Sequence, residues 1–174
     1  MTSETPQQRV FFALWPDEAV REALSRLAKH LEGDGRPVPA GHLHLTLAFP
    51  GTVPSGVVSR LVARMYSVEV PAIRLRLDAL GYFARPRIAW VGPSEVPETL
   101  VELANALNGL CAEAGVRMEQ RSFRPHVSLR RGVTRFQPAR FPPLDWMTDR
   151  IVLVESGGNG HPGPYRILAS HPGR

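Results

Sequence analysis

Apolar residues along the chain form short runs typical of strands and three-to-four-residue spacings typical of helices. The run at 10–15 predicts a strand, and it stops at 16–18, where proline and two acids form a helix-start signal. Leucine and valine then recur at spacings of four, three and four between 20 and 31, which predicts one apolar helical face. The glycines at 33–35 end this helix. A strand is predicted at 43–47 by the alternation of leucine with polar residues.

The second half of the chain repeats this order of elements. A short apolar run at 87–91 predicts a strand, 93–95 starts a helix, and leucines between 100 and 110 share one helical face. Gly115 ends the helix, and 125–129 predicts the matching strand. The two helix-opening prolines are 93 − 16 = 77 residues apart, and the two strands with a histidine are offset similarly. An internal repeat of this kind predicts two lobes related by a pseudo-twofold axis.

The remaining segments complete a mixed pattern of helices and hairpin-like strands. We predict a helix at 55–66, a strand at 72–80, a proline-rich loop at 134–146, a strand at 152–154, a turn-rich connection at 157–164 and a strand at 165–168. This order predicts an α+β fold with mainly antiparallel sheets and a central cleft. We expect residues 1–174 to form a single bilobal domain, since no linker or low-complexity segment interrupts the chain.

Two of the predicted strands carry the candidate catalytic residues. Strand side chains alternate between faces, so His44 and Thr46 share one face, together with His42 and Ala48. The leucines between them supply the core from the opposite face, on which alternation also places Phe49.

The equivalent strand of the second half places His126 and Ser128 together in the same way. Pseudo-twofold symmetry would bring both histidines to one cleft. Near neutral pH one imidazole can take a proton from water while another protonates a leaving oxygen. The two hydroxyls can donate hydrogen bonds to an anion between them. This set suits a phosphodiester.

Composition and charge narrow the class of protein. The chain has 21 basic and 16 acidic residues, a net charge of +5, and a single lysine, Lys29. The arginine excess indicates either genome composition or a polyanionic substrate, because guanidinium binds phosphate through paired hydrogen bonds. Cys111 is the only cysteine, so an intramolecular disulfide is excluded and a reducing compartment is expected. No segment has the length of a membrane span, and the first residues do not form a signal peptide. We therefore expect a cytoplasmic protein and, because each chain holds its own site, a monomer.

These motifs resemble those of the RNA 2′,3′-cyclic phosphodiesterases, formerly called 2′-5′ RNA ligases, in the two-histidine phosphoesterase superfamily. The resemblance runs from about 9 to 165 and rests on RVFFAL at 9–14, GRPV at 35–38, HLHLTLAF at 42–49, GYFARPRIAWVG at 81–92 and SFRPHVSLRR at 122–131. It implies a bilobal α+β fold with the active site between the lobes. It also implies metal-free hydrolysis of RNA 2′,3′-cyclic phosphate ends to a 2′-phosphate, without a cofactor.

The resemblance also assigns roles to individual residues. His44 would be the general acid on the departing 3′ oxygen, and His126 the general base on water. Thr46 and Ser128 would hold phosphate oxygens. The family often carries an arginine at the position of Arg131. Strict strand alternation from His126 instead favours Arg130, so both stay open.

Two aromatic residues, Phe49 and Tyr165, are further candidates for substrate binding because their rings can stack on a base. The sequence departs from the family pattern at Ser128, where threonine is more usual, and at Pro50, where leucine is common. Serine keeps the hydroxyl, so we expect activity to survive. Pro50 leaves the substrate preference open.

Other functions remain as alternatives at this point. The same site would serve small cyclic nucleotides or 2′-5′ linked oligonucleotides, or would join RNA ends without ATP by reversing the hydrolysis. The arginines alone would suit a non-catalytic RNA-binding module. An ATP-dependent ligase is disfavoured, since the chain lacks a phosphate-binding GxxxxGK[ST] loop. A metal site at His42 and His44 is disfavoured too, because no third ligand lies nearby in the sequence.

Overall fold

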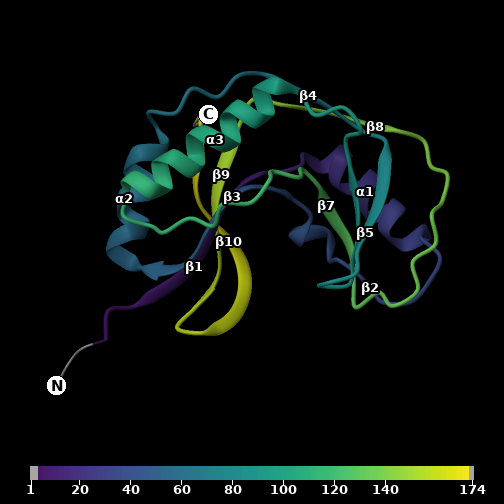
Figure 1. The fold of residues 1–174 in the computed structure, drawn as a ribbon, viewed down its shortest axis with the longest axis horizontal. Coiled ribbons are helices and arrows are strands. Elements are labelled where there is room, and N and C mark those ends of the chain that lie inside the picture. The colour runs from purple at the N-terminus through teal and green to yellow at the C-terminus, as the bar shows by residue number, and fades with distance from the viewer. Residues whose placement is uncertain (1–3, 173–174) are drawn as a thin grey trace.

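The computed structural model describes residues 4–172, so the ends of the predicted 1–174 domain, at 1–3 and 173–174, lie outside the described residues. An eight-stranded antiparallel sheet runs through the molecule in the order β10-β9-β1-β3-β7-β6-β5, with β2 paired to β7 (Figure 1). Its strands are β1 Gln7–Leu14, β2 Arg36–Pro37, β3 Leu45–Pro54, β5 Ala79–Phe83, β6 Ile88–Gly92, β7 Val127–Arg131, β9 Ile151–Gly158 and β10 His161–His171. β3 and β7 are the neighbours at which the two halves meet, and β1 and β6 flank them in turn. This arrangement reproduces the predicted internal repeat and the mainly antiparallel α+β fold.

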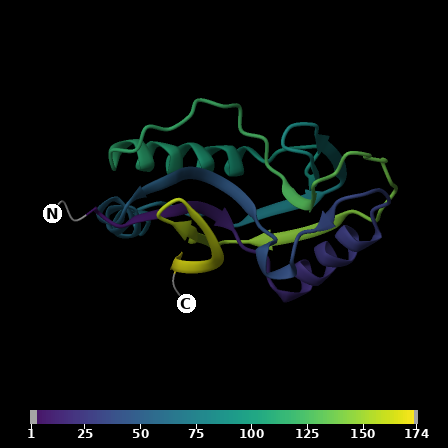
Figure 2. The same cartoon turned by 90° about the horizontal axis from the view of Figure 1, so that it is seen from below.

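Three α-helices of the described residues cover the sheet, and the two helices of the repeat pack against the opposite halves. α1, Glu18–His30, follows β1 in sequence but contacts β7 and β8, whereas α3, Glu98–Glu113, contacts β3 and α2, Ser55–Met65. Figure 2 shows α3 along one half of the sheet and α1 along the other. The apolar stripes of these helices and the sheet form one buried cluster, so the two halves share a core.

The start of α1 follows from local chemistry that the sequence shows. Asp17 is the N-cap, and its carboxylate accepts a hydrogen bond from the backbone N–H of Val20 at 2.9 Å. Glu18 in the first turn and Lys29 in the last turn complement the helix dipole. The helix therefore begins where the proline–acid signal predicts.

Three predicted segments differ from the structure. The connection expected at 157–164 is only a tight turn at 159–160, because β9 runs to Gly158 and β10 begins at His161. The strand expected at 72–80 is two strands, β4 Ile73–Leu77 and β5, which separate at Asp78 because the Asp78 carboxylate binds the backbone N–H and hydroxyl of Ser94. The loop expected at 134–146 ends early, since β8, Leu144–Thr148, pairs with β4 in a separate two-stranded sheet. Trp146 is 1% exposed there, and its burial stabilises a strand that the prolines before it obscure.

Within residues 4–172 there is no helix long and apolar enough to cross a membrane.

Replacing Gly81 with alanine should destabilise the second half of the sheet. Gly81 pairs with Trp90 across β5 and β6, and a Cβ at this glycine would overlap the indole ring. Overpacking of this kind costs about 1–3 kcal/mol. We expect Gly81→Ala to lower the free energy of unfolding in urea by that amount.

The matched control is Gly109→Ala, at an exposed position of α3 with open space around the Cβ position. Alanine is the better helix former, so this change should raise stability by up to about 1 kcal/mol. Equal stability of the two variants would contradict the packing of Trp90 over Gly81.

Candidate active site

The candidate site lies where β3 meets β7. These strands share a single antiparallel register pair, Leu45 with Val127, and both side chains are fully buried. Extending this register by one residue in each direction sets His44 opposite Ser128 and Thr46 opposite His126. All four point to the face away from the buried pair, because side chains alternate along a strand. The structure therefore brings the two predicted His-x-Thr/Ser motifs together.

Both histidine rings are held by the same hydrogen bond. Nδ1 of His44 donates to the carbonyl oxygen of His42 at 2.7 Å, and Nδ1 of His126 donates to that of Arg124 at 2.8 Å. A carbonyl only accepts, so Nδ1 carries the proton and Nε2 of each neutral ring is left with a lone pair. Nε2 of His44 faces the Thr46 hydroxyl at 3.1 Å. Each ring thus presents one nitrogen for proton transfer.

Aromatic rings enclose His44. Phe11 and Trp15 of the β1 region stack on its imidazole, with centroid separations of 4.6 and 5.8 Å. Tyr165 of β10 meets the same ring edge-on at 5.6 Å. Sequence reasoning named Tyr165 as a substrate-binding candidate but missed Phe11 and Trp15. Their signal was present, since Phe11, Ala13 and Trp15 alternate with the core residues of β1.

His126 has its own, different aromatic surround. Phe83 meets it edge-on at 5.0 Å, and Trp90 lies tilted at 6.1 Å. Both come from the β5–β6 hairpin, which the sequence does not connect to His126. The indole Nε1 of Trp90 is buried without a hydrogen-bond partner among the described residues. The two histidines are therefore equivalent in backbone position and unlike in side-chain environment.

Burial and positive charge favour the neutral form of both histidines. Burial lowers the pKa of His44 to about 4; its bond to the His42 carbonyl opposes this shift, while the charges of Arg131 and His126 add to it. Burial also lowers the pKa of His126, again against a carbonyl bond and with help from Arg131. In the free protein at neutral pH, both rings are ready to accept a proton at Nε2.

The structure separates the two candidate arginines. The guanidinium of Arg130 donates to three backbone carbonyls, those of Ala28 at 3.0 Å, Gly35 at 3.0 Å and Asp34 at 3.3 Å. It therefore ties β7 to the end of α1 and the loop that follows. Arg131 is exposed and close enough for its charge to lower the pKa of both histidines. The geometry thus gives Arg130 a structural position and sets Arg131 beside the histidines.

Phe49 does not lie on the face that strand alternation predicts, and His42 lies before the strand although it contacts Tyr165 as His44 does. β3 has one extra residue relative to β1 between Thr46 and Ala48 and another between Ala48 and Gly51. The first sets Ala48 opposite Phe12 on the core face, so Ala48 is buried and Phe49 is 46% exposed, the reverse of the expected faces. Phe49 contacts Arg9, whose guanidinium carbon lies 4.7 Å from the ring centroid. His42 ends a short 3-10 turn, Ala40–His42, and stacks on Tyr165 at 4.1 Å.

No group of three or more His, Cys, Asp or Glu side chains in residues 4–172 is placed to hold a metal ion. Cys111 is buried on α3, where its surroundings raise the thiol pKa to about 12. It belongs to the core, as its position on the apolar helix face predicts.

The fold and the site define a class: mixed α/β proteins in which two strands at the centre of a duplicated sheet each present a histidine. The chain belongs to the 2′-5′ RNA ligase superfamily, whose family model matches residues 15–160. The family resemblance seen in the sequence motifs is therefore confirmed.

Curated relatives and solved structures agree with this membership. The chain is 35% identical to an RNA 2′,3′-cyclic phosphodiesterase of Escherichia coli over 80% of each chain. It is 34% identical to one of Thermus thermophilus, over 85% of this chain and 81% of the relative. The apo crystal structure of E. coli LigT superposes with a TM-score of 0.81 at 32% identity, covering 95% of this chain and 96% of LigT. LigT complexed with 3′-AMP is equally similar, with a TM-score of 0.81.

Replacing His44 should make the free energy of unfolding fall less as the pH is lowered from neutral to mildly acidic. The folded protein holds the His44 pKa near 4, whereas the unfolded chain has a value near 6.5, so acid protonates the unfolded state first. Stability from this group is present above pH 6.5 and is lost as the pH falls toward 4. Between pH 7.5 and 5 this loss amounts to roughly 2 kcal/mol.

We expect His44→Phe, which keeps a ring against Phe11, to lose about that much less unfolding free energy than the wild type over this interval. Urea unfolding at the two pH values measures it. An identical pH dependence in both proteins would show that burial does not lower the His44 pKa.

Arg131→Met should change the histidine pKa values, whereas Arg130→Met should change the stability. Removing the Arg131 charge should raise the pKa of both histidines, as followed by NMR titration of their ring protons, with little change in stability. Removing Arg130 leaves three carbonyls without their charged donor and should cost roughly 2 kcal/mol of unfolding free energy. A higher histidine pKa in the Arg130 variant alone would show that Arg130, and not Arg131, lies beside the histidines.

Proposed function

We propose that the chain hydrolyses RNA 2′,3′-cyclic phosphate ends to 2′-phosphomonoesters, with His44 as general acid and His126 as general base. The observation that carries this proposal is the pair of histidines on adjoining strands, each with Nδ1 bound to a carbonyl and Nε2 available. The names of the relatives, RNA 2′,3′-cyclic phosphodiesterases, support the substrate class.

The reaction needs one proton taken up and one given. Nε2 of His126 accepts a proton from water, whose oxygen attacks phosphorus. The bond from phosphorus to the 3′ oxygen breaks as Nε2–H of His44 protonates that oxygen. The products are a 2′-phosphate and a free 3′ hydroxyl, and a proton transfer from His126 back to His44 through solvent restores the enzyme. Positioned acids and bases of this kind contribute about 10²–10⁴-fold each.

The low pKa of His44 fits this role once substrate binds. A general acid must be protonated, and the free protein favours neutral His44. A phosphodiester bound beside the ring adds a negative charge, which raises the pKa of a nearby imidazole. Substrate binding is therefore coupled to proton uptake on His44. His126 has its pKa lowered by burial and by Arg131, which suits a base that must start unprotonated.

Three groups hold the phosphate in this proposal. Thr46 and Ser128 lie on the same face as the histidines, and the Ser128 hydroxyl makes no hydrogen bond to another described residue. Arg131 supplies the positive charge for the nonbridging oxygens. Tyr165, beside His44 and His42, offers a ring for the terminal base. The acid, base and anion donors all come from the chain itself, so we propose chemistry without a metal and expect hydrolysis to continue in excess chelator.

We also propose that the chain acts as a single bilobal domain and a monomer. One sheet and one buried cluster join both halves of the described residues, and each histidine motif comes from the same chain.

The acid and base roles can be told apart with a sulfur-substituted substrate. His44→Ala and His126→Ala should each lower kcat for a 2′,3′-cyclic phosphate by about 10²–10⁴-fold. Replacing the 3′ oxygen by sulfur gives a leaving group that departs without protonation, since a thiol has a pKa near 8.5.

This substrate should recover most of the lost rate in His44→Ala and none in His126→Ala, with the product's phosphate position assigned by phosphorus NMR. Recovery in His126→Ala alone would exchange the two roles. Near-wild-type hydrolysis by both variants would end the two-histidine proposal.

A further inference from the structure

A second group of cationic and polar side chains lies on the same face of the sheet as His44. At the bulges between β1 and its neighbours β3 and β9 the extra residues belong to the partner strands, so the residues of β1 still alternate between the main core and a smaller cluster containing Phe11 and Ala13. Arg9 is two residues before Phe11, so it shares the face on which Phe11 stacks with His44. Two strand residues span about 7 Å, which sets Arg9 beside the candidate active site along β1.

Arg9 lines a cavity of about 340 Å³ whose other lining residues are Thr52, Ser156, Gly158, Gly160 and His161. The lining contains no carboxylate. The neighbouring acid on β9, Glu155, is bound by Arg166 at 2.7 Å and by Gln8 at 3.0 Å. None of the ion pairs between described residues includes Arg9. This cavity therefore has a net positive lining and suits an anion.

The Arg9 side chain is held ready for a ligand. Its Nη1 donates to the hydroxyl of Ser156 at 2.8 Å, and its guanidinium lies over the ring of Phe49. Ser156 is a buried polar residue, 3% exposed, at a bulge of β9 that faces the cavity. Gly158 has to lack a side chain, because a Cβ there would overlap the carbonyl oxygen of Gln7. Ordering the guanidinium in advance lowers the entropy lost on binding.

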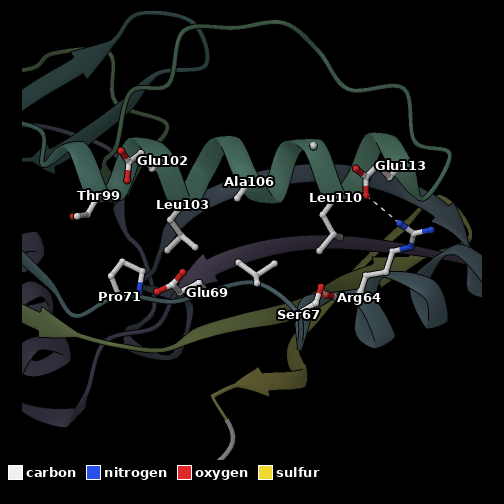
Figure 3. A pocket seen from close by; sticks show the side chains of 12 residues that line it. Arg64, Ser67, Glu69, Pro71, Thr99, Glu102, Leu103, Ala106, Leu110 and Glu113 are labelled. Atoms are coloured by element: carbon white, nitrogen blue, oxygen red, sulfur yellow. Dashed lines mark hydrogen bonds and ion pairs between the residues drawn. The ribbon is translucent and has the colours of Figure 1, made fainter.

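Another cavity of the molecule has a lining of the opposite charge. A cavity of about 690 Å³ lies against α3 and the end of α2. Figure 3 shows Glu69, Glu102 and Glu113 at its wall. Its one arginine, Arg64, is paired with Glu113 at 3.1 Å. That lining repels a polyanion, so a positive lining is not a property of every cavity in this basic protein.

We propose that Arg9, with Ser156, His161 and Phe49, forms a subsite for the phosphodiester and base that precede the terminal nucleotide of the substrate. The inference rests on the proposed function. An RNA that ends in a cyclic phosphate continues only through the 5′ oxygen of its last nucleotide, so a second anion site on this face meets the next phosphate. Arg9 binds that phosphate through its free donors, and the exposed Phe49 ring stacks on a base. The enzyme then favours oligonucleotide ends over cyclic mononucleotides.

Steady-state kinetics on two substrates tests the subsite. Adenosine 2′,3′-cyclic phosphate fills the active site alone, and a ribotrinucleotide with the same end also reaches Arg9. We expect Arg9→Gln to raise KM for the trinucleotide about tenfold and to change kcat/KM for the mononucleotide by less than twofold. Arg9→Lys, which keeps the charge but loses the paired donors, should fall between. The slope of log KM against log salt for the trinucleotide should drop by about 0.7, as expected for one lost phosphate contact on a single strand.

The matched control is Arg26→Gln, which removes an exposed charge from α1 that is paired with Glu22, and it should change neither substrate. Circular dichroism checks that each variant is folded. Equal KM changes for both substrates, or none for either, would overturn the subsite while leaving the hydrolytic function intact.

A wild type that hydrolyses neither substrate would instead overturn the proposed function. In that case the subsite is tested by measuring the affinity for a labelled trinucleotide carrying a 2′-phosphate by fluorescence anisotropy. Binding about tenfold weaker in Arg9→Gln supports the subsite, and equal binding refutes it.

Discussion

The arrangement of this molecule depends on the junction between β3 and β7, where one register pair joins two halves of a sheet. Leu45 and Val127 are fully buried at that junction, and each directly follows a histidine. Because strand side chains alternate, burying this pair directs His44 and His126 to the opposite face. The helices pack against the opposite halves, and both halves share one core. The spacing of the two imidazoles is therefore fixed by packing against elements distant in sequence.

The surroundings of the histidines affect their protonation, and through it both the stability of the fold and the proposed reaction. Stacked aromatic rings remove His44 from water, and Arg131 adds positive charge, so the protonated form is disfavoured in the free protein. The same burial would strengthen the interaction with the phosphate of the proposed substrate, because charges interact more strongly in a low dielectric. In the proposed mechanism, this environment keeps both imidazoles neutral in the free protein, and the bound phosphate raises the pKa of His44 so that the two histidines can act as acid and base.

Duplication supplies two equivalent positions, and the side chains make them different. Both histidines use Nδ1 in the same hydrogen bond, which follows from the shared backbone geometry. Their surroundings differ, since His44 is enclosed by β1 and β10 and His126 by the β5–β6 hairpin. The side of the sheet that contains β1, β3, β9 and β10 also has the bulges of β3 and β9, which turn Phe49 outward and place Ser156 against Arg9. The two sides of the candidate site therefore present different surfaces, which is the basis of the subsite proposed at Arg9.

The sequence by itself determined the repeat, the helices, most strands and the two histidine motifs, because these depend on short-range periodicity and on residues one or two positions apart. It did not determine that 72–80 divides at Asp78, since that break comes from a bond to Ser94, sixteen residues later. Nor did it determine the face of Phe49, because a bulge shifts alternation by one residue without a local signal. Only the tertiary structure separated Arg130 from Arg131, since their neighbours come from other parts of the chain. Arg130 binds carbonyls at the end of α1 and in the loop that follows, whereas Arg131 lies near the two imidazoles. Contacts between distant segments are set by how whole elements pack, and no local pattern of residues encodes them.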